Sequence, residues 1–239
     1  MLAILRAPAA PRSTGWQPAR ERLVTESTAD LGHPLFARLF DRLSPMMERE
    51  LRPLRQELIG GLRGRVLEVG AGNGLNFAHY PEDVSEVIAL EPEPYLRARA
   101  ELAAAAAPVP VTVLGGRAET VPAPAGSFDA AVASLVLCSV SVLPQALAEL
   151  RRVLRGGGEL RFFEHVCSDR PGKARAQRLL DRSGAWPLVA GGCHCGRATV
   201  AAITAAGFRI EQHRHLDLGP AWLHANPYVI GRAQAASER

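Results

Sequence analysis

The chain has 239 residues, of which 47% are hydrophobic and 22% charged, proportions typical of a soluble globular protein with one domain. Its net charge of +4 is small, and its arginines alternate with glutamates instead of forming a stripe, which argues against a nucleic-acid partner. No apolar run reaches the roughly 20 residues that cross a bilayer, and the four cysteines are too few for a disulfide framework, so we expect a cytoplasmic protein with reduced thiols.

The hydrophobic pattern of the chain changes near residue 31. Residues 1–30 are rich in Pro, Ala, Arg and Thr without a sustained hydrophobic period, so we expect a loosely ordered segment. Apolar residues then recur at helical spacing through residues 31–62, which predicts two helices, the second stopped by the glycine pair at 60–61. We assign residues 31–239 to a single domain.

Short apolar strands alternate with helices from residue 65 onward. Strands are predicted at 66–69, 87–90, 111–114, 130–134 and 160–164, and helices at 76–80, 95–105 and 143–154, the last closed by the glycines at 156–158. This alternation is typical of an α/β fold with a parallel sheet covered on both faces. Two further strands, within 207–218 and 227–233, follow one another without a helix, which predicts an antiparallel edge hairpin and seven strands in all.

The segment "EVGAGNG" joins the first strand to the following helix. Gly70, Gly72 and Gly74 have no Cβ, so the backbone can turn sharply and lie against a ligand at the carboxyl end of the sheet. A dinucleotide fingerprint would need a glycine where Leu75 stands, and a phosphate loop would need a Gly-Lys-Ser/Thr ending. The preceding Glu68 would repel a pyrophosphate. A plain turn and a site for a cationic nucleoside both remain open.

Glu91 follows the next strand, where a carboxylate can accept hydrogen bonds from both hydroxyls of a ribose. Glu68 near the glycine loop would attract a cation. S-adenosylmethionine carries both an ammonium and a sulfonium group, so the two acids and the loop together favour this nucleoside.

These segments resemble the motifs of the class I S-adenosylmethionine-dependent methyltransferases, in the ubiquinone-type subgroup. The resemblance rests on "VLEVGAGNG", "ALEPEP", "GGRAETVPAPAGSFDAAVASLVLCSV" and "ALAELRRVLRGGGELRFFEH", and it extends over about residues 35–233. It implies a Rossmann-like doubly wound sheet and S-adenosylmethionine as cofactor. One departure from the family pattern is Arg117, where many relatives carry an aspartate for the adenine amine.

The resemblance also implies the residues of the cofactor site. The backbone around the three glycines would hold the amino-acid part, and Glu91 the ribose. Two residues would lie at the adenine edge and two beneath the methionine. The full expected set is Glu68, Gly70, Gly72, Gly74, Asn76, Glu91, Pro92, Ala118 and Glu119 (adenine edge), and Ser134 and Leu135 (beneath the methionine).

The closer resemblance is to methyltransferase-like small-molecule thiol S-methyltransferases, through "NFAHYP" (76–81), "LVLCSV" (135–140), "GGC" (191–193) and "AAGF" (205–208). It implies a small thiol or dithiol acceptor, methylated in detoxification or secondary-metabolite tailoring. Animal members carry an N-terminal membrane anchor, which we do not carry over. Ubiquinone and menaquinone C-methyltransferases share many of these residues, so C- or O-methylation of a quinone-like or phenolic acceptor is the alternative. Arsenite-type metalloid methylation and a non-catalytic, cofactor-binding partner protein are further alternatives.

Two residues are candidates for chemistry on the acceptor. His165, at the carboxyl end of the fifth strand, can accept the proton of a thiol or satisfy a loop carbonyl. Asp181 lies in the segment 165–196, where relatives build the acceptor pocket, and can orient a base, contact substrate or be a surface charge.

The segment "GGCHCGR" invites a metal interpretation. Cys193 and Cys195 are too close in sequence to share a tetrahedral zinc ion comfortably, and only Cys167 and His165 could join them, so no metal is predicted. Cys138 lies in an apolar run and is expected in the core.

Overall fold

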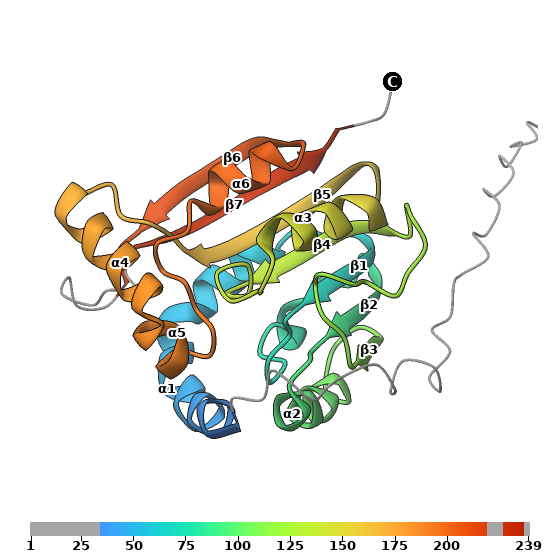
Figure 1. The fold of residues 1–239 in the computed structure, drawn as a ribbon. Coiled ribbons are helices and arrows are strands. Elements are labelled where there is room, and N and C mark those ends of the chain that lie inside the picture. Colours follow the sequence, from blue (N-terminus) through green and yellow to red (C-terminus); the bar gives the residue numbers. More distant parts are fainter. Residues whose placement is uncertain (1–33, 219–226, 237–239) are drawn as a thin grey trace, which may run out of the picture.

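The computed structural model describes residues 34–218 and 227–236, so the expectation for residues 1–30 lies outside the described residues. Five parallel strands form the centre of the sheet: β1 (Gly64–Val69), β2 (Val84–Leu90), β3 (Val111–Leu114), β4 (Phe128–Ser134) and β5 (Leu154–His165). The strand order is β3-β2-β1-β4-β5-β7-β6 (Figure 1). The predicted α/β fold with a mostly parallel, seven-stranded sheet is confirmed.

The last two strands, β6 (Phe208–Leu216) and β7 (Tyr228–Ala235), form the antiparallel edge. β7 lies between β5 and β6 and is antiparallel to both, with Tyr228 opposite His165 at the end of β5. The predicted edge hairpin is therefore confirmed.

Helices cover both faces of the sheet because its strands are apolar on both sides. On one face, Leu147 and Leu150 of α3 (Leu143–Val153) and Ile203 of α6 (Thr199–Ala205) pack on the sheet. On the other face, α1 (Pro34–Ile59) and α2 (Pro94–Ala104) contribute Leu58 and Ala100 to a second cluster. Of the helices described, none combines the length and the apolar character needed to cross a bilayer.

Three local expectations were wrong. Residues 34–59 form one helix instead of two, with Pro45 and Pro53 inside it, because each proline removes only one backbone hydrogen bond and the buried apolar face continues past it. The segment expected as a helix at 76–80 is a single 3-10 turn, η1 (Phe77–His79). The glycines at 156–158 lie within β5: Phe128 pairs with Leu154 and Ala130 with Glu159, so the glycines take up the extra chain.

The segment after β5 folds into two helices, α4 (Pro171–Ser183) and α5 (Ala185–Val189), before returning to the sheet at α6. Figure 1 shows α5 beside the N-terminal part of α1. A Cβ on Gly191, just after α5, would collide with the ring of Phe36 on α1. The segment just after α5, within the predicted insertion at 165–196, thus contacts the first helix.

Candidate active site

The glycine loop leaves β1 at Val69 in a conformation that L side chains rarely adopt. Gly70, Gly72 and Gly74 have φ of 63°, 58° and 81°. A Cβ on Gly70 would overlap the side chain of Val136, and one on Gly74 would lie 2.8 Å from the Cβ of Ala103. A Cβ on Gly72 would meet only the ring of Phe40, at 3.6 Å. Packing therefore accounts for Gly70 and Gly74, whereas the backbone at Gly72 is left uncovered.

Glu91 lies against this uncovered backbone. Its Oε2 accepts a hydrogen bond of 2.7 Å from the amide of Gly72, and its Oε1 accepts one of 2.9 Å from the amide of Glu93. Burial raises the pKa of the Glu91 carboxyl, while the two amide bonds act in the opposite direction. Each oxygen retains a second lone pair, so the carboxylate can still accept hydrogen bonds from a ligand.

Glu68, at the end of β1, is held by hydrogen bonds from within the protein. It is buried behind the loop, where its two oxygens accept hydrogen bonds of 2.7 Å from Asn76 Nδ2 and from the hydroxyl of Tyr80. Arg55 of α1 donates in turn to Asn76 Oδ1 at 2.8 Å. Burial raises the pKa of Glu68 to about 7, despite the hydrogen bonds that favour its charged form. Glu68 and Asn76 thus tie the loop to η1 and α1.

The loop after β4 lies beside the glycine loop, because Val136 packs against Gly70. It begins at the half-buried Ser134 and at Leu135, which is the only non-glycine with positive φ among the described residues, at 58°. The amide of Leu135 donates to the carbonyl of Phe163 at 2.7 Å. Sparsely populated backbone conformations of this kind cost about 1–3 kcal/mol and cluster at functional sites.

The residues expected at the adenine edge lie between β3 and α3. Ala118 is buried in the core, and Oε1 of Glu119 accepts hydrogen bonds from the amides of Ser141 and Val142 at 2.8 and 3.3 Å. Glu119 therefore holds the start of α3. Pro92, which follows Glu91, is half-buried.

Two residues that sequence reasoning missed hold the loop after β4 in place. Glu164, fully buried near the end of β5, accepts hydrogen bonds from the amides of Val136, Leu137 and Cys138 at 3.1, 2.9 and 3.1 Å. Burial raises its pKa well above the ordinary value. Arg197 donates to the carbonyls of Leu137 and Val140 at 2.6 and 2.7 Å. Glu164 could have been found from the sequence, because it is an acid inside the apolar run "FFEHV". No sequence pattern marks Arg197.

His165 ends β5 as expected and is half-buried there. Its Nδ1 lies 3.6 Å from Sγ of Cys138 and 3.5 Å from Sγ of Cys193, and its ring stands against that of Tyr228 with 4.5 Å between centroids. Cys138 is buried as expected, but its thiol faces this imidazole. The interaction with Cys193 and burial raise the pKa of Cys138 above its ordinary value.

Asp181, on α4, does not bind His165. Its two oxygens accept hydrogen bonds from the amides of Cys195 and Gly196 at 3.2 and 2.8 Å, and the thiol of Cys195 lies 3.6 Å away. The carboxylate therefore fixes the loop that carries Cys193.

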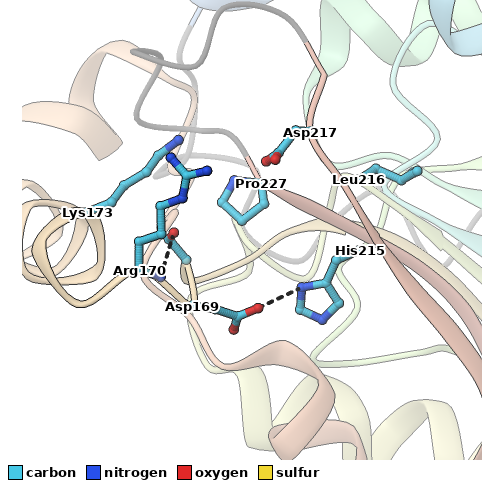
Figure 2. A pocket seen from close by; sticks show the side chains of 8 residues that line it. Asp169, Arg170, Lys173, His215, Leu216, Asp217 and Pro227 are labelled. Carbon is cyan, nitrogen blue, oxygen red and sulfur yellow. Dashed lines mark hydrogen bonds and ion pairs between the residues drawn. The ribbon is translucent and has the colours of Figure 1, made fainter.

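A separate pocket opens at the surface between the start of α4, the end of β6 and the start of β7. Figure 2 shows Asp169 turned toward His215, with 3.8 Å between Oδ2 and Nδ1, and Arg170 and Lys173 on another side of the pocket. Its walls carry charges of both signs. None of the residues expected to bind cofactor or acceptor lines this pocket, so the candidate site is the one at the glycine loop and His165.

Comparison with known proteins identifies the family. A family model described as a methyltransferase domain matches residues 67–162. The thiol S-methyltransferase TMT1B of Homo sapiens is 30% identical over 212 residues, which cover 83% of this chain and 85% of that protein. The chain belongs to the class I S-adenosylmethionine-dependent methyltransferases. It is thus an enzyme of the methyltransferase class with S-adenosylmethionine as cofactor.

This methyltransferase is also similar to proteins other than thiol S-methyltransferases. The ubiquinone/menaquinone biosynthesis C-methyltransferase UbiE of Methylobacterium nodulans is 30% identical over 219 residues, covering 79% of this methyltransferase and 86% of the relative. Among solved structures, that of the [4+2]-cyclase SpnF superposes with a TM-score of 0.64 at 19% identity, covering 84% of the methyltransferase and 95% of the cyclase. This last likeness shows the fold alone.

Proposed function

We propose that this enzyme transfers a methyl group from S-adenosylmethionine to the sulfur of a small-molecule thiol or dithiol, in detoxification or in the tailoring of a secondary metabolite. The observation that carries the proposal is the similarity to thiol S-methyltransferases, which extends over more than four-fifths of this chain. The acceptor is a small molecule, and no nucleic acid takes part in the proposed reaction.

The residues at the glycine loop fit the cofactor. Gly72 exposes backbone that a side chain would cover, and the Glu91 carboxylate beside it keeps lone pairs for the two hydroxyls of a ribose. We assign the amino-acid part of the cofactor to the backbone of the glycine loop. The remaining proposed contacts are Pro92 beside the ribose, Ala118 and Glu119 at the adenine, and Ser134 and Leu135 beneath the methionine.

Glu68 and Asn76 are proposed to act through the loop, because their polar atoms are already engaged with one another and with Tyr80 and Arg55. Above a pH of about 7 the ionised Glu68 would add a negative charge behind a cationic cofactor. Its contribution to binding is therefore electrostatic and at a distance.

His165 is proposed to remove the proton of the acceptor thiol. When bound, S-adenosylmethionine supplies an electrophilic methyl group, and the enzyme's own task is to hold the thiol in line and deprotonate it. A thiol is already a few per cent ionised at neutral pH, so one proton acceptor is enough. Nδ1 of His165 faces the two cysteines, which leaves Nε2 for the acceptor. Asp181 is proposed as a positioning residue that orders the loop of Cys193 beside the imidazole.

The state of the cysteines indicates the redox conditions in which the enzyme works. All four are free, and the donor atoms of Cys138, His165 and Cys193 lie within 4.8 Å of one another. An oxidising compartment would favour pairing of two thiols held so close. We therefore propose the reducing cytoplasm as its location.

The alternative function is C- or O-methylation of a quinone-like or phenolic acceptor, favoured by the similarity to UbiE. The two are separated by incubating the purified enzyme with S-adenosylmethionine and three acceptors on one scaffold: an aryl thiol, the matching phenol and the matching hydroquinone. Release of S-adenosylhomocysteine is the readout, corrected for the uncatalysed reaction. We expect the thiol to react at least tenfold faster than either of the others.

Turnover of the phenol or hydroquinone alone would assign the alternative. Arsenite as a fourth acceptor tests metalloid methylation, which would replace the thiol proposal if arsenite were preferred. Tight cofactor binding without product from any acceptor would identify a non-catalytic partner protein.

A further inference from the structure

Two thiol sulfurs and one imidazole nitrogen converge beside the end of β5. Sγ of Cys138, Nδ1 of His165 and Sγ of Cys193 come from three separate segments, and all lie within 4.8 Å of one another. The nitrogen is 3.6 Å from the first sulfur and 3.5 Å from the second. The backbone fixes the arrangement, because the amide of His194 donates to the carbonyl of Cys138 at 2.8 Å.

The two nitrogen–sulfur separations match the corresponding edges of a metal-centred tetrahedron. Zinc binds thiolate sulfur at about 2.3 Å and imidazole nitrogen at about 2.0–2.1 Å, so a tetrahedral angle puts a sulfur and a nitrogen ligand about 3.6 Å apart. Both observed distances agree with this value within 0.1 Å. The two sulfur–nitrogen edges therefore already have the length that a tetrahedral ion requires, and the two sulfurs lie within 4.8 Å of one another.

The cluster needs only one of the two closely spaced cysteines in "GGCHCGR". Cys193 and Cys195 are too close to share one ion comfortably, and the structure separates them: the thiol of Cys195 faces Asp181, while that of Cys193 faces His165. Cys138, which the sequence places in the core, supplies the second sulfur. Two thiolates and a neutral imidazole would balance the charge of a divalent ion in this buried place.

We propose that Cys138, His165 and Cys193 bind a divalent cation of the zinc class and leave its fourth coordination position open. Among residues 34–218 and 227–236, no further Cys, His, Asp or Glu joins the cluster. Three protein ligands with an open position are the pattern of reactive zinc sites, whereas structural sites have four. The two cysteines are buried, and His165 is the half-buried member of the cluster.

The cation would change the role that we propose for His165. A metal on Nδ1 leaves the single proton of the neutral ring on Nε2, so the imidazole cannot accept a proton while the metal is bound. Metal binding and proton acceptance are then alternative states of one cluster. This consequence rests on the proposed function, whereas the site itself does not.

The test uses cobalt as a spectroscopic probe on the full-length chain, reduced and stripped with a chelator. We expect one equivalent of Co²⁺ to produce the sulfur-to-cobalt charge-transfer band and the intense visible bands of a tetrahedral site, and Zn²⁺ to abolish them. Cys193→Ser and His165→Gln should weaken binding at least tenfold. Cys167→Ser is the matched control, since this half-exposed cysteine lies two residues from His165 and outside the cluster, and its affinity should stay within twofold of wild type.

The proposal is overturned if the wild-type protein gives no charge-transfer band, if Cys193→Ser binds Co²⁺ with wild-type affinity and the full band intensity, or if Cys167→Ser weakens binding as much as Cys193→Ser does. Zn²⁺ should also raise the melting temperature of wild type and of Cys167→Ser, and at the same concentration it should raise that of His165→Gln less. Because His165 is only half-buried, His165→Gln still tests the site if a variant of a buried cysteine does not fold. Binding of S-adenosylhomocysteine, measured on the same samples without metal, separates a failure of the metal site from a failure of the cofactor site.

Discussion

Replacing Gly72 by alanine should impair cofactor binding far more than folding. At φ of 58° an alanine costs about 1–2 kcal/mol in backbone strain. Its Cβ would meet only the ring of Phe40, at 3.6 Å, which is an ordinary van der Waals contact. We therefore expect the free energy of unfolding in urea to fall by about 1–2 kcal/mol. Gly126→Ala is the matched control, because Gly126 has φ of 66° and nothing within 4 Å of an added Cβ.

The two variants should differ in calorimetric titrations with S-adenosylhomocysteine. The methyl group at residue 72 would stand on the proposed cofactor face, so we expect a loss of at least tenfold in affinity, which is about 1.4 kcal/mol or more. Gly126→Ala should bind within twofold of wild type. Gly70→Ala should add about 1–3 kcal/mol of overpacking against Val136 to the backbone cost. Equal cofactor affinities for Gly72→Ala and Gly126→Ala would refute the assignment of the loop.

Four further substitutions test the remaining residues. Glu91→Gln should weaken S-adenosylhomocysteine binding at least tenfold in calorimetry, because an amide cannot accept from both backbone N–H groups and a ribose, whereas the exposed Glu101→Gln should bind normally. The pKa of Glu68 is about 7 against an ordinary 4.5, so the native state keeps a proton that the unfolded chain loses, and this group makes stability fall as pH rises through that window. Urea unfolding should therefore show Glu68→Gln gaining about 2 kcal/mol relative to wild type between about pH 5 and pH 7.5, and a constant difference would contradict the burial argument. His165→Gln should slow thiol turnover about tenfold in the metal-free enzyme with cofactor affinity unchanged, and full activity would remove it from the mechanism. Asp181→Asn should lower the free energy of unfolding by about 1–3 kcal/mol, because its amide group faces a backbone N–H, and a change below 0.5 kcal/mol would show that the loop does not depend on it.

The strands of the sheet could be predicted from the sequence because each one is marked by its own residues and their immediate neighbours. Each parallel strand is an apolar run bounded by polar or glycine residues, so the five central strands were placed to within a few residues at most ends. Gly72 and Glu91 were each predicted to lie at the cofactor site, at the carboxyl ends of two consecutive strands. Their hydrogen bond confirms that they are neighbours.

The parts that could not be predicted depend on distant contacts. Arg55 reaches the Glu68 network from 21 residues before Asn76, and no periodic pattern marks that pairing. Cys138 and Cys193 meet His165 from 27 and 28 residues away, on opposite sides in sequence. An isolated cysteine in an apolar run has the same local pattern whether its thiol is packed in a core or faces an imidazole.

The buried carboxyl of Glu164 has a consequence for how ligands influence one another. It binds the amides of residues 136–138, and its neighbour in sequence is His165, on the proposed acceptor side. Val136 in turn packs on Gly70, on the proposed cofactor side. If one ligand displaced the end of β5, these contacts would carry the displacement to the backbone of the proposed site for the other. Thermodynamic linkage then requires reciprocity: whatever factor an acceptor analogue applies to the affinity for S-adenosylhomocysteine, the nucleoside applies to the analogue.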